Sequence, residues 1–188
     1  MATQPQTHDW TYEELLTLPD DGKRYEIIEG VLYEMPSINT EHAQIVMRLI
    51  LTIFGPLMES AGIQLFTAPL DVFIGEGAVV QPDLVILLPR QLDLIARRGV
   101  EGPPALLVEV LSPDNSTYDR ITKRDLYARA GVAEYWIVSP EAMLVQILTL
   151  DGDHYTVHAR IGGDEPLISP LLPALTGTAA QVFGEGGA

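Results

Sequence analysis

The sequence predicts one domain of the α/β (α+β) class, with a mixed β-sheet flanked by helices. The first observation is a length of 188 residues, which fits the roughly 100–200 residues of a single domain. The second is the composition, because 47% hydrophobic and 20% charged residues are typical of a globular chain. The third is the order of segments: an early long helix, strands, one crossover helix and more strands. We expect a single domain over residues 1–188, with a core at about 10–160 and an irregular tail at 161–188.

The first third of the chain should hold a short helix, a hairpin and a long helix. Thr11 and Glu14 match a capping box, a common start of a helix. The segment "YEIIEGVLYEM" (25–35) alternates around its glycine, which predicts two strands joined by a tight turn. Residues 40–62 carry an apolar pair at every fourth residue, which predicts a helix with one buried stripe. Pro56 should kink that helix or mark its last turn.

The other strands are expected wherever a short apolar run lies between turn residues. These runs are residues 63–68, 70–74, 79–88, 105–112, 134–139, 143–150 and 154–161. Between the fourth and fifth of them, residues 118–131 have the amphipathic pattern of a helix, which Gly131 should end.

The charged residues and the missing cysteines restrict the possible sites and partners. Without cysteine, disulfides and thiolate metal sites are excluded, so oxygen atoms or histidine nitrogens must hold any metal. Eleven Lys and Arg residues against 26 Asp and Glu residues give a net charge of −15, which disfavours tight nonspecific binding of duplex DNA. Residues 90–129 nevertheless hold seven basic and six acidic residues, so a local basic face is possible.

The chain is predicted to be cytoplasmic and to have no membrane partner. Its first ten residues, "MATQPQTHDW", have neither the basic region nor the apolar run of a signal peptide. No uninterrupted apolar stretch approaches the roughly 18 residues that span a bilayer.

Two predicted strands place a single acid among apolar residues. Glu109 is the only charged residue of "ALLVEVLS", and Asp83 is the only one of "VVQPDLVILL". The rest of each strand is apolar on both faces, as in strands that are covered on both sides. An unpaired buried carboxylate is costly. Each acid should therefore lie at a strand end in water, pair with a basic group or bind a cation.

Lys123 is a basic residue that could meet both acids. Its predicted helix follows the Glu109 strand directly, so the side chain could turn back over the end of that strand. Asp83, Glu109 and Lys123 together would form a Mg²⁺ site for phosphodiester hydrolysis, in which the ammonium orients the attacking water. Alternatively, the acids are structural and Lys123 belongs to a solvated basic face of its helix.

Three segments in order, "QPDLVIL", "LLVEVLSP" and "YDRITKRDLYARAGVAEYWIVSP", resemble the Uma-two family of putative restriction endonucleases, within the PD-(D/E)XK nuclease superfamily. The upstream "RYEIIEGVLYEM" and the helix that contains His42 fit the same pattern, so the resemblance covers roughly residues 10–150. It implies a restriction-endonuclease-like fold, a divalent metal and cleavage of DNA. It assigns the two motif acids to Asp83 and Glu109. In the resulting hypothesis these acids bind Mg²⁺ or Mn²⁺ together with the backbone carbonyl of Val110.

The sequence departs from the family pattern at one position. The superfamily lysine normally stands two residues after the second acid, where this chain has Leu111. Lysines that have moved to the following helix are known in the superfamily, so the resemblance leaves Lys123 as the candidate catalytic lysine.

Three further residues are secondary candidates. His42 lies near the start of the long helix, opposite its apolar stripe; it could approach the site, although a solvated position is preferred. Asp71 could offer a third metal ligand. Glu29, like Glu26, flanks the first tight turn, where the family pattern hints at an acid, but surface charge on a hairpin explains both residues equally well.

The main functional hypothesis is a Mg²⁺-dependent DNA endonuclease. A homodimer would suit it, because a double-strand cut needs two active sites or two visits. Two alternatives remain open. One is a catalytically silent module of the same fold that binds nucleic acid or protein, suggested by the net charge and by Leu111. The other is a metal-dependent hydrolase of a smaller phosphate ester.

Overall fold

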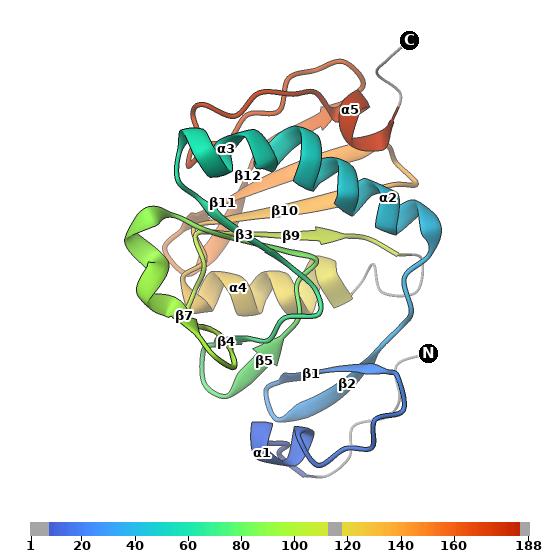
Figure 1. Cartoon of the computed structure of the whole chain (residues 1–188), viewed down its shortest axis with the longest axis vertical. Coiled ribbons are helices and arrows are strands. Elements are labelled where there is room, and N and C mark those ends of the chain that lie inside the picture. Colours follow the sequence, from blue (N-terminus) through green and yellow to red (C-terminus); the bar gives the residue numbers. More distant parts are fainter. Residues whose placement is uncertain (1–7, 113–117, 185–188) are drawn as a thin grey trace.

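The strands form two mixed six-stranded sheets where the sequence predicted one sheet (Figure 1). The structure is a computed structural model that describes residues 8–112 and 118–184; residues 1–7, 113–117 and 185–188 lie outside the described part. Sheet A has the order β2-β1-β5-β4-β8-β7, with β1 (Arg24–Ile28), β2 (Val31–Met35), β4 (Val72–Ile74), β5 (Ala78–Val80), β7 (Ile95–Ala96) and β8 (Gly99–Glu101). Sheet B has the order β12-β11-β10-β9-β6-β3, with β3 (Gln64–Thr67), β6 (Leu84–Leu87), β9 (Leu106–Val110), β10 (Glu134–Ser139), β11 (Leu144–Asp151) and β12 (His154–Gly162).

Helices cover both faces of sheet B (Figure 1). One face carries the long helical run, and the other carries the crossover helix that joins the parallel strands β9 and β10. The helical segments are α1 (Tyr12–Leu15), α2 (Thr40–Arg48), the π-helical η1 (Leu49–Phe54), α3 (Gly55–Ser60), the 3₁₀ segment η2 (Pro89–Leu94), the π-helical η3 (Tyr118–Lys123), α4 (Arg124–Ala130) and α5 (Ala179–Phe183). The predicted capping box of Thr11 and Glu14 is confirmed, and so is the left-handed Gly131 that ends α4.

The predicted long helix is one continuous run whose middle is π-helical. Pro56 lies in the first turn of α3, where the π-helical segment passes into α-helix again, four residues before the run ends at Ser60. Proline has no N–H and its ring crowds the preceding turn, and the turn before it is widened so that the N–H of Gly55 bonds the carbonyl of Ile50. The run from Thr40 to Ser60 is also long and apolar enough, by length and composition alone, to cross a membrane. Its buried stripe packs onto sheet B through Ile45, Leu49, Ile53 and Leu57.

The central strands of sheet B alternate their side chains between two apolar cores. Leu106 and Val108 of β9 face the core under α2, η1 and α3. Leu107 faces the core that sheet B shares with α4 and sheet A. Glu109 shares this second face by alternation, and only 4% of its surface is exposed. Because both faces of β9 are covered, Glu109 does not lie at a strand end in water.

The segment "VVQPDLVILL" does not form the single strand that was predicted. It is divided at Gln81, Pro82 and Asp83 into β5 of sheet A and β6 of sheet B. Proline cannot donate to a strand ladder, so it favours such a break. Asp83 consequently lies at the start of β6, where the chain passes from one sheet to the other.

The tail is less irregular than the sequence predicted. It contains α5, which begins with a capping box between Thr178 and Gln181. Leu167, Leu172 and Val182 belong to the same core as α2 and sheet B. Glu134, at the start of β10, is fully buried and anchors this tail, because its carboxylate accepts hydrogen bonds from the Trp136 indole N–H (2.6 Å) and the Leu171 N–H (3.3 Å).

Glu134 should make the stability of the fold depend on pH. Burial raises the pKa of Glu134, and the hydrogen bonds from Trp136, Ser169 and Leu171 oppose this rise only in part. A raised pKa in the folded state stabilises the fold below the ordinary glutamate value, and this contribution is lost as pH rises through the raised value. As pH rises through this range, the free energy of unfolding of the wild type should therefore fall relative to that of Glu134→Gln. The expected fall is about 1.4 kcal/mol for each pH unit by which the pKa of Glu134 is raised. Urea unfolding of both proteins at mildly acidic and neutral pH measures this difference; an equal difference at both pH values would contradict it.

Candidate active site

The three principal candidates from the sequence line one cavity at the ends of β6 and β9. This cavity of about 30 Å³ has room for one or two water molecules. The charged and polar residues that line it include Arg24, His42, Gln81, Asp83, Glu109 and Lys123. Asp83, Glu109 and Lys123, which lie on three different elements, are therefore brought together.

Lys123 points into the protein from the end of η3. Its side chain is 1% exposed, and its Nζ donates hydrogen bonds to Glu109 Oε1 (2.8 Å) and Glu26 Oε1 (2.9 Å). The next residue, Arg124, is exposed and pairs with Asp125. The alternative that Lys123 belongs to a solvated helix face is therefore wrong. A buried ammonium is tolerated here because two carboxylates are bonded to it.

Glu109 is held from the helix side by two donors. Besides Lys123, the hydroxyl of Tyr127 donates to Glu109 Oε1 at 2.8 Å. Burial raises the pKa of Tyr127 well above its ordinary value, and the negative charges of Glu109 and Glu26 raise it further. The phenol consequently remains a protonated donor, and it fixes the orientation of the carboxylate from one turn beyond Lys123.

Asp83 is held beside Glu109 by the neighbouring strand. Its Oδ2 accepts a hydrogen bond from the N–H of Val110 at 2.8 Å. The antiparallel register pairs Leu84 with Val108, so Asp83 lies opposite Glu109, one residue beyond the last pair. Residues opposite each other in such a ladder have Cα atoms about 4.5–5.5 Å apart. The two acids are therefore close enough to share one small ligand.

His42 is buried, so the solvated position preferred from the sequence is wrong. It lies in the first turn of α2, where its backbone N–H bonds the N-cap Asn39. Its Nε2 contacts Asp83 Oδ1 at 2.9 Å, while its Nδ1 is buried without a hydrogen-bond partner among the described residues. The prediction that His42 lies opposite the apolar stripe was also wrong, because His42 stands three residues before Ile45 and seven before Leu49 and so shares their buried face of the helix.

Glu26 is a site residue, although the sequence explained it equally well, together with Glu29, as surface charge on a hairpin. It is fully buried in β1; its Oε1 accepts from Lys123 and from the N–H of Gln81, and its Oε2 accepts from the Tyr118 hydroxyl. Glu29, the secondary candidate, is instead in the exposed turn and pairs with Arg129. The signal was present, because an acid beside two apolar residues inside a strand is the pattern that identified Glu109.

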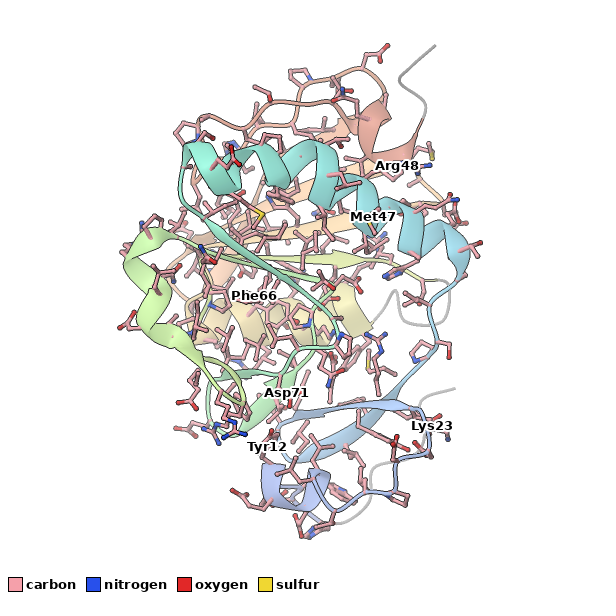
Figure 2. All side chains as sticks on the ribbon, in the orientation of Figure 1. Tyr12, Lys23, Met47, Arg48, Phe66 and Asp71 are labelled. Atoms are coloured by element: carbon pink, nitrogen blue, oxygen red, sulfur yellow. The ribbon has the colours of Figure 1, made fainter. Side chains whose placement is uncertain are left out.

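Asp71 reaches the cavity only through Gln81. In Figure 2 it lies near Tyr12, whose hydroxyl donates to Asp71 Oδ2 at 3.3 Å. Its Oδ1 accepts from the side-chain amide of Gln81 at 2.9 Å, and it does not line the cavity itself. Gln81 Oε1 is buried without a hydrogen-bond partner among the described residues. An amide is uncharged, which is why the sequence pattern did not identify Gln81.

The residues of the cavity fit a hard divalent cation. Asp83 and Glu109 are buried carboxylates of the cavity wall, and Glu26 is a third buried carboxylate that is bonded to Lys123. These three acids outnumber the cationic side chains of Lys123 and Arg24 that line the cavity, so part of an added positive charge would be compensated. Within the described ranges, no group of three or more His, Asp or Glu side chains is arranged to hold a metal ion. Mg²⁺ commonly uses only one or two carboxylates and completes its shell with waters and substrate phosphate. The orphaned Gln81 Oε1 adds a neutral oxygen of the kind that such cations accept.

Comparisons with known proteins identify the fold and the family of the chain. A crystal structure of "a putative nuclease belonging to DUF820" from Anabaena variabilis ATCC 29413 has the same fold, with a TM-score of 0.76 and 18% sequence identity over 94% of this chain and 98% of that one. No curated protein matches the chain. The family model Uma2, described as "Putative restriction endonuclease", matches residues 12–181 and thus nearly the whole chain. The resemblance inferred from the sequence is therefore confirmed, and the chain belongs to the Uma2 family of nuclease-fold proteins.

Proposed function

We propose that this protein is a Mg²⁺- or Mn²⁺-dependent endonuclease that hydrolyses phosphodiester bonds of DNA. The observation that carries the proposal is the bond from Lys123 to Glu109 inside a cavity that Asp83 also lines. Two acids at the ends of adjacent strands, with a lysine beside them, are groups that cation-assisted phosphodiester hydrolysis can use. Membership of the Uma2 family supports the nuclease class.

Each residue has a role that follows from its contacts. Asp83, Glu109 and the backbone carbonyl of Val110 would hold the cation, with Gln81 Oε1 as a further neutral oxygen. The cation would lower the pKa of a bound water and neutralise charge on the phosphate. Lys123 would orient the attacking water from the cavity wall. His42 and Tyr127 act through the acids, because they fix the carboxylates of Asp83 and Glu109 by hydrogen bonds.

The position of Lys123 also accounts for Leu111. Leu111 is 6% exposed and belongs to the core that sheet B shares with α4 and sheet A. A lysine there would have to pass through apolar surroundings, which would penalise its charge. The ammonium comes instead from η3 and is compensated by Glu26, an acid of sheet A.

The alternative is a catalytically silent module of the same fold. The hydrogen bonds themselves favour it: Lys123 is bonded to two acids and Asp83 to two donors, so the cluster would also serve to join sheet A, sheet B and η3. Metal titration separates the two functions, because only the nuclease must bind Mg²⁺ or Mn²⁺ at these acids.

The nuclease proposal predicts cleavage that needs both the metal and Asp83. Supercoiled plasmid should be nicked with Mg²⁺ or Mn²⁺ and left intact with EDTA, and Asp83→Asn should lower the rate by at least about 10²-fold. Asp125→Asn, which changes an exposed acid of α4, is the matched control and should nick at the wild-type rate. Parallel reactions with single-stranded DNA, RNA and nucleotides define the substrate class. Nicking that persists in EDTA or in Asp83→Asn at the wild-type rate would refute the assignment.

A further inference from the structure

A second and larger cavity lies on the same face of sheet B as Glu109. It has a volume of about 220 Å³. Its floor is built from three adjacent strands, by Ile137 and Ser139 of β10, Leu144 and Gln146 of β11, and Arg160 of β12. Arg120 of η3 completes its wall. The cavity thus lies beside η3, on the face of sheet B that carries the crossover helix.

The strand register connects this cavity to the candidate active site. Glu109 pairs with Ile137, Ile137 with Gln146, and Gln146 with Arg160, so the four residues form one row across four strands. Paired residues face the same side of a sheet. At about 4.8 Å for each strand spacing, the row places the Arg160 Cα atom roughly 14 Å from that of Glu109. The segment η3 lies between the two cavities, with Lys123 lining the first and Arg120 the second.

The two arginines give the second cavity a positive character that contrasts with the net charge of −15. Both side chains are exposed, and neither forms an ion pair with any residue that the structure describes. Arg98, Arg124 and Arg129 are paired with Glu101, Asp125 and Glu29, respectively. Guanidinium groups bind phosphate through two parallel N–H donors. Ser139 and Gln146 place a hydroxyl and an amide, both able to donate to phosphate, beside them.

We propose that Arg120 and Arg160 form a phosphate-binding subsite that holds the DNA backbone away from the scissile bond. This inference rests on the proposed nuclease function for its substrate. One DNA strand carries a charge at every 3.4 Å of helix axis, so a separation of roughly 14 Å corresponds to about four nucleotides. The subsite holds DNA in register with Asp83 and Glu109, and it explains how an acidic protein binds a polyanion at a local basic site.

Binding without metal tests the subsite separately from cleavage. Fluorescence anisotropy of a short labelled DNA duplex in EDTA, over a series of salt concentrations, is measured for the wild type, Arg120→Gln, Arg160→Gln and the double variant. Each single substitution should weaken binding about tenfold and reduce the slope of log K against log salt by about one. Arg97→Gln removes an exposed arginine that lines neither cavity and should bind like the wild type. Equal affinity and equal salt slope for the cavity variants and Arg97→Gln would overturn the proposal.

Two further experiments identify the source of the bound phosphate and separate the subsite proposal from the nuclease proposal. Inorganic phosphate is titrated into wild type and the double variant: arginine-dependent binding of phosphate, with unchanged binding of DNA, would overturn the assignment to the DNA backbone.

In the cleavage assay, the arginine variants should raise KM and leave kcat unchanged, because the subsite acts on binding alone. If Asp83→Asn shows that the nuclease proposal fails, the loss of DNA affinity in EDTA still supports the subsite. If the nuclease proposal holds and the arginine variants match Arg97→Gln, the subsite alone is refuted.

Discussion

Replacing Lys123 with methionine should lower the free energy of unfolding by about 3–5 kcal/mol and abolish cleavage. The substitution keeps the length of the apolar side chain and removes the ammonium that both Glu26 and Glu109 contact. Both carboxylates are buried, so their charge would have to be neutralised by proton uptake or by local opening. Urea unfolding at neutral pH measures the loss.

Two comparisons show whether this loss comes from the buried charges. Arg124→Met removes the adjacent but exposed cation, which pairs with Asp125, and should cost about 1 kcal/mol or less. The triple variant Glu26→Gln/Glu109→Gln/Lys123→Met leaves no uncompensated charge in the cluster and should recover much of the stability. A Lys123→Met protein as stable as Arg124→Met would show that the buried contacts contribute little.

Local patterns in the sequence were sufficient for some of the individual elements. The capping box of Thr11 and Glu14, the hairpin around Gly30 and the end of α4 at Gly131 depend on residues close together in the chain. The two-sheet arrangement depends on pairing between distant strands, such as β1 with β5 and β9 with β6. Alternation along a strand indicates which residues share a face, but not which strand lies beside it. For this reason the sequence predicted one sheet and placed Asp83 within a single strand.

The same difference between local patterns and contacts of distant residues explains which residues of the candidate site could be predicted from the sequence. Glu109 and Asp83 were identifiable because an acid in an apolar strand must be compensated wherever that strand lies. Glu26 was discounted because a hairpin next to a turn is usually at the surface. Its carboxylate contacts residues far away in the chain, Gln81 and Lys123 among them. Gln81 and His42 contribute through contacts with residues 10 and 41 positions away in the chain. Those contacts depend on the tertiary structure alone.

Glu109→Gln should abolish metal-dependent cleavage while Glu134→Gln should leave it unchanged. Both residues are buried glutamates on neighbouring parallel strands, but Glu109 lines the cavity and Glu134 anchors the tail. The glutamine at 109 keeps an acceptor for Tyr127 and Lys123, and Lys123 keeps Glu26, so the protein should fold. Changes that only disturb the orientation of a metal ligand lower activity about 10–100-fold. Removing the ligand itself should therefore lower the cleavage rate by more than about 10²-fold.

Metal binding gives this comparison a second readout that does not depend on cleavage. Mg²⁺ at about one hundred times its dissociation constant should stabilise the wild type and Glu134→Gln by about 2.7 kcal/mol, because the ion binds the folded state alone. Glu109→Gln should gain almost nothing at the same concentration. If Glu109→Gln is stabilised by Mg²⁺ as strongly as Glu134→Gln, the ion is held elsewhere and Glu109 serves only as the buried partner of Lys123. If Glu109→Gln loses both cleavage and stabilisation by Mg²⁺, the carboxylate of Glu109 at the end of β9 holds the cation. Metal binding then accounts for the burial of this acid.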